Sequence, residues 1–276
     1  MTHRSLLSRR LTLVFGATLG ITAAQLGLGA VAGCGSTGGQ RISLGTRVVA
    51  AEGVTEPFEN AFGWKVQLTK ARVSVGELYY FTGPPVVASL TPRPPRPGHL
   101  PLFSIPSAHA HPGHYTEGDA LGQMLTPQTV DLLVETDLAD AEAVTGHYES
   151  ARFSFASPPA GDLAEGLDGD VILVEGEAKK DTATVPFRVS ATREDILNAD
   201  GNPYVEGCVF EIADIDAEGT VTVTLHPDVW FDQVDFAKAP APTGTDPVDL
   251  PPGEAPHKAF TRGLKKGTAY TFAYAP

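Results

Sequence analysis

Hydrophobic and polar residues alternate in short segments along most of the chain after residue 40. The alternation is regular over residues 64–69 and 220–225, and a period of two residues is typical of strands with one buried face. Turn-forming pairs such as Asp168-Gly169 separate several of these segments. Strands are predicted over residues 41–51, 63–82, 130–134, 147–155, 171–178, 183–191, 204–212, 220–225 and 268–274.

Helical patterns are few and short. Residues 117–125, 137–144 and 192–199 could each form about two turns of helix. Many short strands with few helices favour an all-β fold, and we expect an antiparallel β-sandwich with few short helices and long Pro-rich loops. Those surface loops are predicted over residues 83–106 and 237–256.

No repeat or change of composition divides residues 41–276. We therefore expect them to form one β-sandwich domain, with two small sandwiches in tandem as the alternative. Residues 34–40 form a short tether in front of this domain. Residues 1–33 have the pattern of an export signal, because three arginines precede a long run of mainly apolar residues.

The end of this signal, Val31-Ala32-Gly33-Cys34, resembles the lipobox of bacterial lipoproteins. The resemblance implies that Cys34 is diacylated and becomes the first residue of the mature protein. No aspartate follows Cys34, so the implied location is the outer membrane of a bacterial cell envelope, facing the periplasm, with the membrane bound through the lipid. An uncleaved membrane anchor is the alternative, because the apolar run is long enough to span.

The charge balance excludes one large class of partners. The chain has 20 basic and 33 acidic residues, a formal net charge of -13, and such a surface does not neutralise the phosphates of nucleic acid. Two cysteines also exclude a disulfide-rich scaffold. With Cys34 lipidated, Cys208 is the remaining thiol, and its apolar surroundings in the sequence predict a buried small hydrophobic residue.

The strongest candidate for chemistry is a cluster of three histidines, His109, His111 and His114, around Pro112-Gly113. Residues two apart on an extended segment point to the same side, and Pro-Gly suits the centre of a type II turn. The three imidazoles could therefore converge on one transition metal ion, and Cu and Zn both accept neutral imidazole. The alternative is a solvated polar loop.

Further ligands are expected downstream of this cluster. Glu117 and Asp119 could supply oxygen, and His147 is the preferred remote ligand, because it shares strand parity with Phe153 and Phe155 and is expected to face inward. Three other histidines are expected to be solvated: His99 and His257, which lie in or beside the Pro-rich segments, and His226, which precedes Pro227.

A calcium site is a weaker alternative. Residues 214–219 begin like an EF-hand loop, but Leu225 stands where the bidentate glutamate is required. The chain has no G-x-S-x-G elbow, P-loop, dinucleotide fingerprint or H-E-x-x-H motif. We therefore expect a binding protein and not an enzyme.

Several segments are similar to periplasmic copper-binding proteins associated with methanobactin operons. They are residues 130–133, 146–148 and 151–153, together with Trp230-Phe231 and the segment 234–236. The resemblance implies a β-rich periplasmic domain and hints at copper. The long Pro-rich loops and the histidine motif depart from that group.

Two functions from different classes follow from these observations. The first is binding of Cu or Zn for sensing, storage or delivery to a transporter. The second is a non-enzymatic envelope interaction module that binds a glycan or a protein partner. Exposed aromatic residues, such as Tyr79, Tyr80 and Phe81, would favour the second function. For these three we expect a core strand instead, because successive aromatic residues occupy both faces of a buried sheet.

Overall fold

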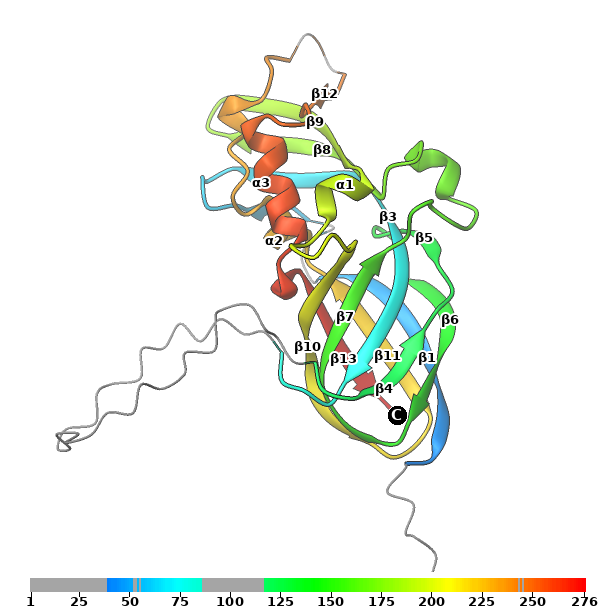
Figure 1. Ribbon diagram of the computed structural model, residues 1–276. Helices are drawn as coiled ribbons and strands as arrows, with labels where there is room; N and C mark the ends of the chain where they lie inside the picture. The colour runs from blue at the N-terminus through cyan, green and yellow to red at the C-terminus, as the bar shows by residue number, and fades with distance from the viewer. Residues whose placement is uncertain (1–38, 52–53, 55, 86–116, 243, 245) are drawn as a thin grey trace, which may run out of the picture. The chain divides into compact units, whose positions relative to one another are not determined.

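Strands dominate the computed structural model, which describes residues 39–51, 54, 56–85, 117–242, 244 and 246–276 (Figure 1). The predicted signal, Cys34 and most of the predicted tether lie outside these residues. In the described ranges, no helix has the length and apolar character needed to cross a membrane. The stretch Gly38–Pro276 forms one unit by its internal contacts.

The all-β class expected from the alternation is confirmed, and the helical elements are short. The strands of the described residues are β1 (Arg41–Ala50), β2 (Phe58–Glu59), β3 (Lys65–Phe81), β4 (Ala120–Met124), β5 (Gln128–Asp131), β6 (Thr136–Val144), β7 (Gly146–Phe155), β8 (Ile172–Lys180), β9 (Ala183–Ala191), β10 (Tyr204–Ile215), β11 (Gly219–Leu225), β12 (Val248–Asp249) and β13 (Tyr270–Ala275). The helices are η1 (Ala164–Leu167), α1 (Arg193–Ile196), α2 (Pro227–Phe231), η2 (Phe236–Lys238), α3 (Ala255–Leu264) and η3 (Gly267–Ala269).

Eight of these strands close into a ring. Their order is β3-β4-β6-β1-β11-β13-β10-β7, and β7 pairs again with β3. The closing contact joins Val75 to Phe155 and Phe81 to Ser150. Because every strand of the ring has two neighbours, the ring has no free edge over the paired residues.

The long strand β3 belongs to two parts of the sheet. Its second half lies in the ring, and its first half pairs with β8 from Lys65↔Lys179 to Val73↔Ile172. Beyond β8 the sheet continues through β9 and β12, and we call these three strands the extension. Helices α2 and α3 lie beside the extension (Figure 1).

Aromatic contacts join the helices to the extension. The ring of Phe187 on β9 lies 5.3 Å from that of Phe231 on α2, and Phe231 lies 5.0 Å from Phe260 on α3. Aromatic pairs at such centroid distances contribute beyond their buried area. The helices are therefore held by packing on the sheet, although their own sequences are short.

The structure differs from two stacked antiparallel sheets, because the thirteen strands in the described residues belong to a single mixed sheet. The pairs β1–β11, β10–β13 and β9–β12 are parallel. The prediction of helices over residues 117–125 and 137–144 is wrong. The first segment contains β4, and the second forms most of β6. In β6, Ala141 and Ala143 are buried while Asp140 and Glu142 are exposed, which is the period of a strand.

The helix expected over residues 192–199 is confirmed as the single turn α1. Thr192 caps it through a capping box with Asp195, which satisfies two backbone donors at the start of the helix. The second Pro-rich segment, residues 237–256, was expected to be a surface loop, but it contains β12, most of η2 and the start of α3. Pro256 occupies the first turn of α3, where the missing N–H costs nothing.

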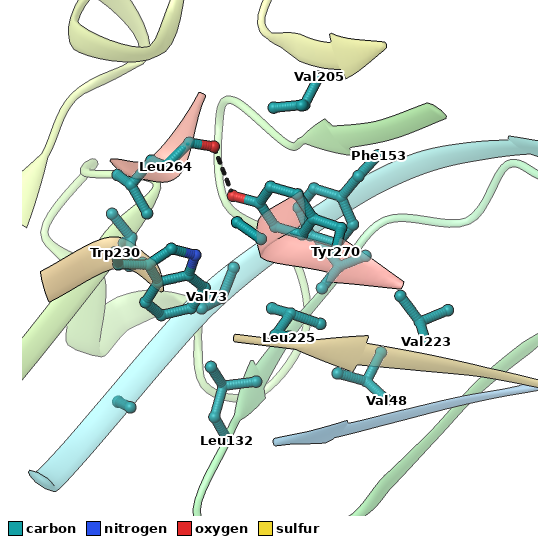
Figure 2. Close-up of a cluster of buried hydrophobic side chains, with 14 of the residues drawn as sticks. Val48, Val73, Leu132, Phe153, Val205, Val223, Leu225, Trp230, Leu264 and Tyr270 are labelled. Carbon is teal, nitrogen blue, oxygen red and sulfur yellow. Dashed lines mark hydrogen bonds between the residues drawn. The ribbon is translucent and has the colours of Figure 1, made fainter. Parts of the chain in front are cut away.

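The core inside the ring is apolar and rich in aromatic residues. Phe153 of β7 stacks on Tyr270 of β13 at 4.2 Å between ring centroids. The buried hydroxyl of Tyr270 donates to the carbonyl of Leu264 at 2.8 Å, so this polar atom is satisfied. Figure 2 shows these residues together with further packed side chains, including Val48, Val73, Leu132, Val205, Val223, Leu225 and Trp230.

Candidate functional site at the base of the histidine loop

The predicted histidine ligands lie on the segment 86–116, which we call the histidine loop. His109, His111 and His114 are outside the described residues, so their role as metal ligands stays a prediction. The structure does describe the residues at both ends of this loop, and these residues form the base from which the candidate site is built.

The two ends of the histidine loop are fixed beside each other. The amide of Gly83 donates to the carbonyl of Glu117 at 2.9 Å, and the amide of Thr82 donates to the carbonyl of Asp119 at 3.1 Å. The Thr82 hydroxyl accepts from the Asp119 amide at 3.1 Å. The pairing of β3 with β4 therefore continues past the strands and closes the base of the loop.

The loop base lies at the end of the ring where β1 begins. Pairing is antiparallel from β3 to β4, from β4 to β6 and from β6 to β1, so the end of β3 and the starts of β4 and β1 share one end of the ring. The amide of Gln40, one residue before β1, donates to the Thr145 hydroxyl at 2.8 Å. The predicted tether thus joins the ring at the same end as the histidine loop.

Arg152 is the centre of a polar and aromatic cluster at the loop base. Its Nε donates to Glu117 Oε1 at 3.0 Å, and its Nη2 donates to Glu117 Oε2. The guanidinium carbon lies 4.2 Å from the ring centroid of Tyr204 and 5.5 Å from those of Tyr79 and Phe81. A bidentate ion pair with cation–π contacts fixes both orientation and position.

Electrostatics in this cluster follow from partial burial. Burial lowers the pKa of Arg152, but the hydrogen bond and charge of Glu117 outweigh it, so the pKa is raised. Burial, followed by repulsion from Glu117, raises the pKa of Glu206 despite the opposing charge of Arg152. The ion pair with Arg152 therefore holds Glu117, the first residue after the histidine loop, in place.

The structure places His147 on the outer face of the ring, and the expectation that it faces inward is wrong. Tyr148 is buried and His147 is exposed, while Phe153 is fully buried. The register between β7 and β10 shifts between Val209 and Ala213, opposite residues 148–150. This irregularity changes which residues of β7 face inward, so the parity shared in the sequence is lost.

Both ring nitrogens of His147 are engaged. Nδ1 lies 2.7 Å from Asp214 Oδ1, and Nε2 lies 3.0 Å from Glu149 Oε1. The hydrogen bond to Asp214, followed by that to Glu149, raises the pKa of His147. Asp214 begins the weak calcium motif, and its carboxylate is occupied by this histidine.

The described ligand candidates are not gathered into a metal centre. Glu117 is bound by Arg152, and Asp119 follows at the start of β4. No group of three metal-binding side chains forms within the described ranges.

Other expectations have different outcomes. Cys208 is buried and free, as predicted. The prediction that His257 is solvated is wrong. Its exposed fraction is 2%, and its Nε2 forms a hydrogen bond with the Ser190 carbonyl at 3.1 Å. Tyr80 and Phe81 are buried, as expected for a core strand, and Tyr79 is half-buried.

Sequence reasoning missed Arg152, Tyr204 and Glu206 as a cluster. Arg152 occupies a polar position between buried Ala151 and Phe153 on β7, which signals an outward side chain. Its pairing with Glu117 depends on the non-local contact of β7 with β3, and no local pattern predicts that contact.

Comparisons with known proteins give little beyond this geometry. No family model matches the chain, and no curated protein matches it. Among solved structures the chain is similar to MbnP from Methylosinus trichosporium, with 12% sequence identity, a TM-score of 0.40, and coverage of 86% of this chain and 99% of that chain. A likeness this weak assigns no family, metal or cellular location to the chain.

Proposed function

We propose that the protein is a lipid-anchored periplasmic protein that binds one Cu or Zn ion through His109, His111 and His114. Sensing, storage or delivery of the ion to a transporter would be its role. The observation that carries this proposal is the spacing of three imidazoles around Pro112-Gly113. Such a turn brings nitrogen ligands together, and neutral imidazole suits both metals.

Two features of the described residues support the proposal. The base of the histidine loop is closed by backbone hydrogen bonds, and Glu117 is held by Arg152. A closed base reduces the conformational entropy that the loop loses when it gathers around an ion. The ligands would therefore bind more tightly than the same residues on a free peptide.

The position of the loop fits a role near a membrane. Residues 39–41 join the ring at the end that carries the loop base. Lipidation at Cys34, a few residues earlier, would keep this end close to the bilayer. An ion held there is accessible to a membrane transporter, which is the proposed class of partner.

The test is metal binding by a protein that begins at Gly35 and carries no affinity tag. We expect about one Cu(II) or Zn(II) per chain by elemental analysis and calorimetry. Affinity should fall below pH ~6, because protonated imidazole cannot bind a metal. Replacing His109, His111 and His114 together by alanine should abolish binding.

A matched control is available in the same loop. The variant His99→Ala removes a histidine outside the cluster and should leave stoichiometry and affinity unchanged. The variant His147→Ala tests the remote ligand, and a loss of affinity would include His147 in the site. Binding that persists unchanged in the triple variant would refute the proposal.

A further inference from the structure

Four buried polar atoms on β3 and β5 have no hydrogen-bond partner among the described residues, and three of them, all but the Tyr80 hydroxyl, lie near one another in the strand pairing. These three are Arg72 Nε, Ser74 Oγ and Thr129 Oγ1. Ser74 is 0% exposed and Thr129 is 2% exposed. Buried polar groups are almost always satisfied, so a group of three that is not satisfied requires an explanation.

The three side chains lie together on one face of the sheet. Ser74 and Thr129 are directly opposite each other in the antiparallel pairing of β3 with β5. Arg72 is two residues before Ser74, and no register shift interrupts β3 between them, so the two side chains share a face. Val73 points the other way, into the core seen in Figure 2.

The segment 156–170, which we call the cover, closes over this face. The amide of Thr129 donates to the Ala160 carbonyl at 2.7 Å, and the amide of Ala156 donates to the Ser74 carbonyl at 2.9 Å. Gly166 lies against Arg72, since a Cβ at this position would come within 1.5 Å of Arg72 Nη1. The cover therefore shields the three polar atoms from solvent.

The charge of Arg72 is not balanced locally. Asp131 is opposite Arg72 in the strand pairing, but its carboxylate accepts from the Leu133 amide at 3.0 Å. Over the described residues Arg72 forms no ion pair with this or any other carboxylate. Arg72 is half-buried and its Nε is shielded from solvent, and a guanidinium in such a position without a counter-charge favours binding of an anion.

We propose that Arg72, Ser74 and Thr129 form a binding site for one small oxyanion under the cover. A guanidinium and two hydroxyl groups all donate hydrogen bonds, and a sulfate, phosphate or carboxylate group accepts them. The site is on the outer face of the β3–β5 pairing. Its ligand and its residues are separate from those of the histidine loop.

The test is calorimetric titration of the protein beginning at Gly35 with sulfate, phosphate and acetate, at constant ionic strength and with chloride as the reference. We expect saturable binding of one anion per chain by at least one of the three. Sulfate or phosphate binding with no acetate binding identifies a tetrahedral ligand, and the reverse identifies a carboxylate.

Conservative variants locate the binding. Ser74→Ala and Thr129→Val should each weaken it about tenfold, which corresponds to one charge-assisted hydrogen bond, while Thr129→Ser should restore it. The control Thr46→Val removes another buried, unpartnered hydroxyl, on β1, and should leave affinity unchanged.

Two results would overturn the site. One is the absence of saturable binding by all three anions in the folded wild-type protein. The other is unchanged affinity in Ser74→Ala and Thr129→Val, which would mean that water alone satisfies these atoms. Cooperative unfolding of each variant confirms that it is folded.

Discussion

Replacing Arg152 by methionine tests whether the cluster at the loop base stabilises the fold. Methionine keeps an unbranched apolar side chain over the aromatic rings but removes the charge and all the donors. Glu117 then loses both of its hydrogen bonds from Arg152. It would remain beside Glu206, whose pKa is raised by burial and by repulsion from Glu117 and would rise further without the opposing charge of Arg152.

The expected magnitude follows from the burial of the pair. The side chains of Arg152 and Glu117 are 21% and 17% exposed, so solvent screens their interaction only in part. Hydrogen bonds between charged groups contribute about 1.5–3 kcal/mol to stability, and a cation–π contact adds about 0.5–1 kcal/mol. Because these contributions are not additive, we expect the variant to lose about 2–3 kcal/mol.

The assay is urea denaturation together with thermal melting of the protein that begins at Gly35. For a unit of this size the expected loss lowers the Tm by roughly 5–10 °C. The matched control is Arg47→Met, because Arg47 pairs with Glu135 and Asp137 but is 41% exposed, so solvent screens its ion pairs and the loss should be clearly smaller. Equal effects of the two substitutions would refute the reasoning.

Three further outcomes are expected. NMR titration should give His147 a pKa above 6.5, and Asp214→Asn should lower that pKa, since the hydrogen bond to Asp214 is the main cause of the shift. The stabilisation that the raised pKa brings is present below about pH 6.5 and is lost as the pH rises through the raised pKa. A pKa at or below 6.5 would contradict the hydrogen bonds described. Gly263→Ala should destabilise the fold by about 1–3 kcal/mol in urea, because its Cβ would lie 2.4 Å from the Trp230 carbonyl oxygen; an unchanged midpoint would show that α2 and α3 separate easily. Cys208 should resist a thiol reagent until the protein unfolds, because burial raises its pKa to about 12; rapid labelling of the native protein would disprove its burial.

Local pattern predicted most of the strands because their alternation reflects one buried face. Residues 63–82 were expected as a strand, and β3 covers Lys65–Phe81. The pattern failed in β6, where alanine and acidic residues have a helix-like composition but alternate with the period of a strand. It also missed α3, which begins inside the second Pro-rich segment and is held by packing on its neighbours.

The candidate site was less accessible to sequence reasoning, since its geometry depends on contacts between distant segments. The pairing of β7 with β3 brings Arg152 to Glu117 across 35 positions of the chain. The register shift beside Tyr148 turned His147 outward. Neither the ring closure nor an irregularity of this kind has a local signature, whereas the histidine spacing around Pro112 is visible in the sequence alone.

The 17 residues of β3 serve both the ring and the extension. The ring and the extension therefore share one continuous strand, although each could otherwise be taken for a separate module. A gene fragment that ended within β3 would leave each half with unsatisfied amides and carbonyls along its length. Dissecting this protein into smaller working pieces should fail for that reason, and engineered insertions are better directed to the connections between strands.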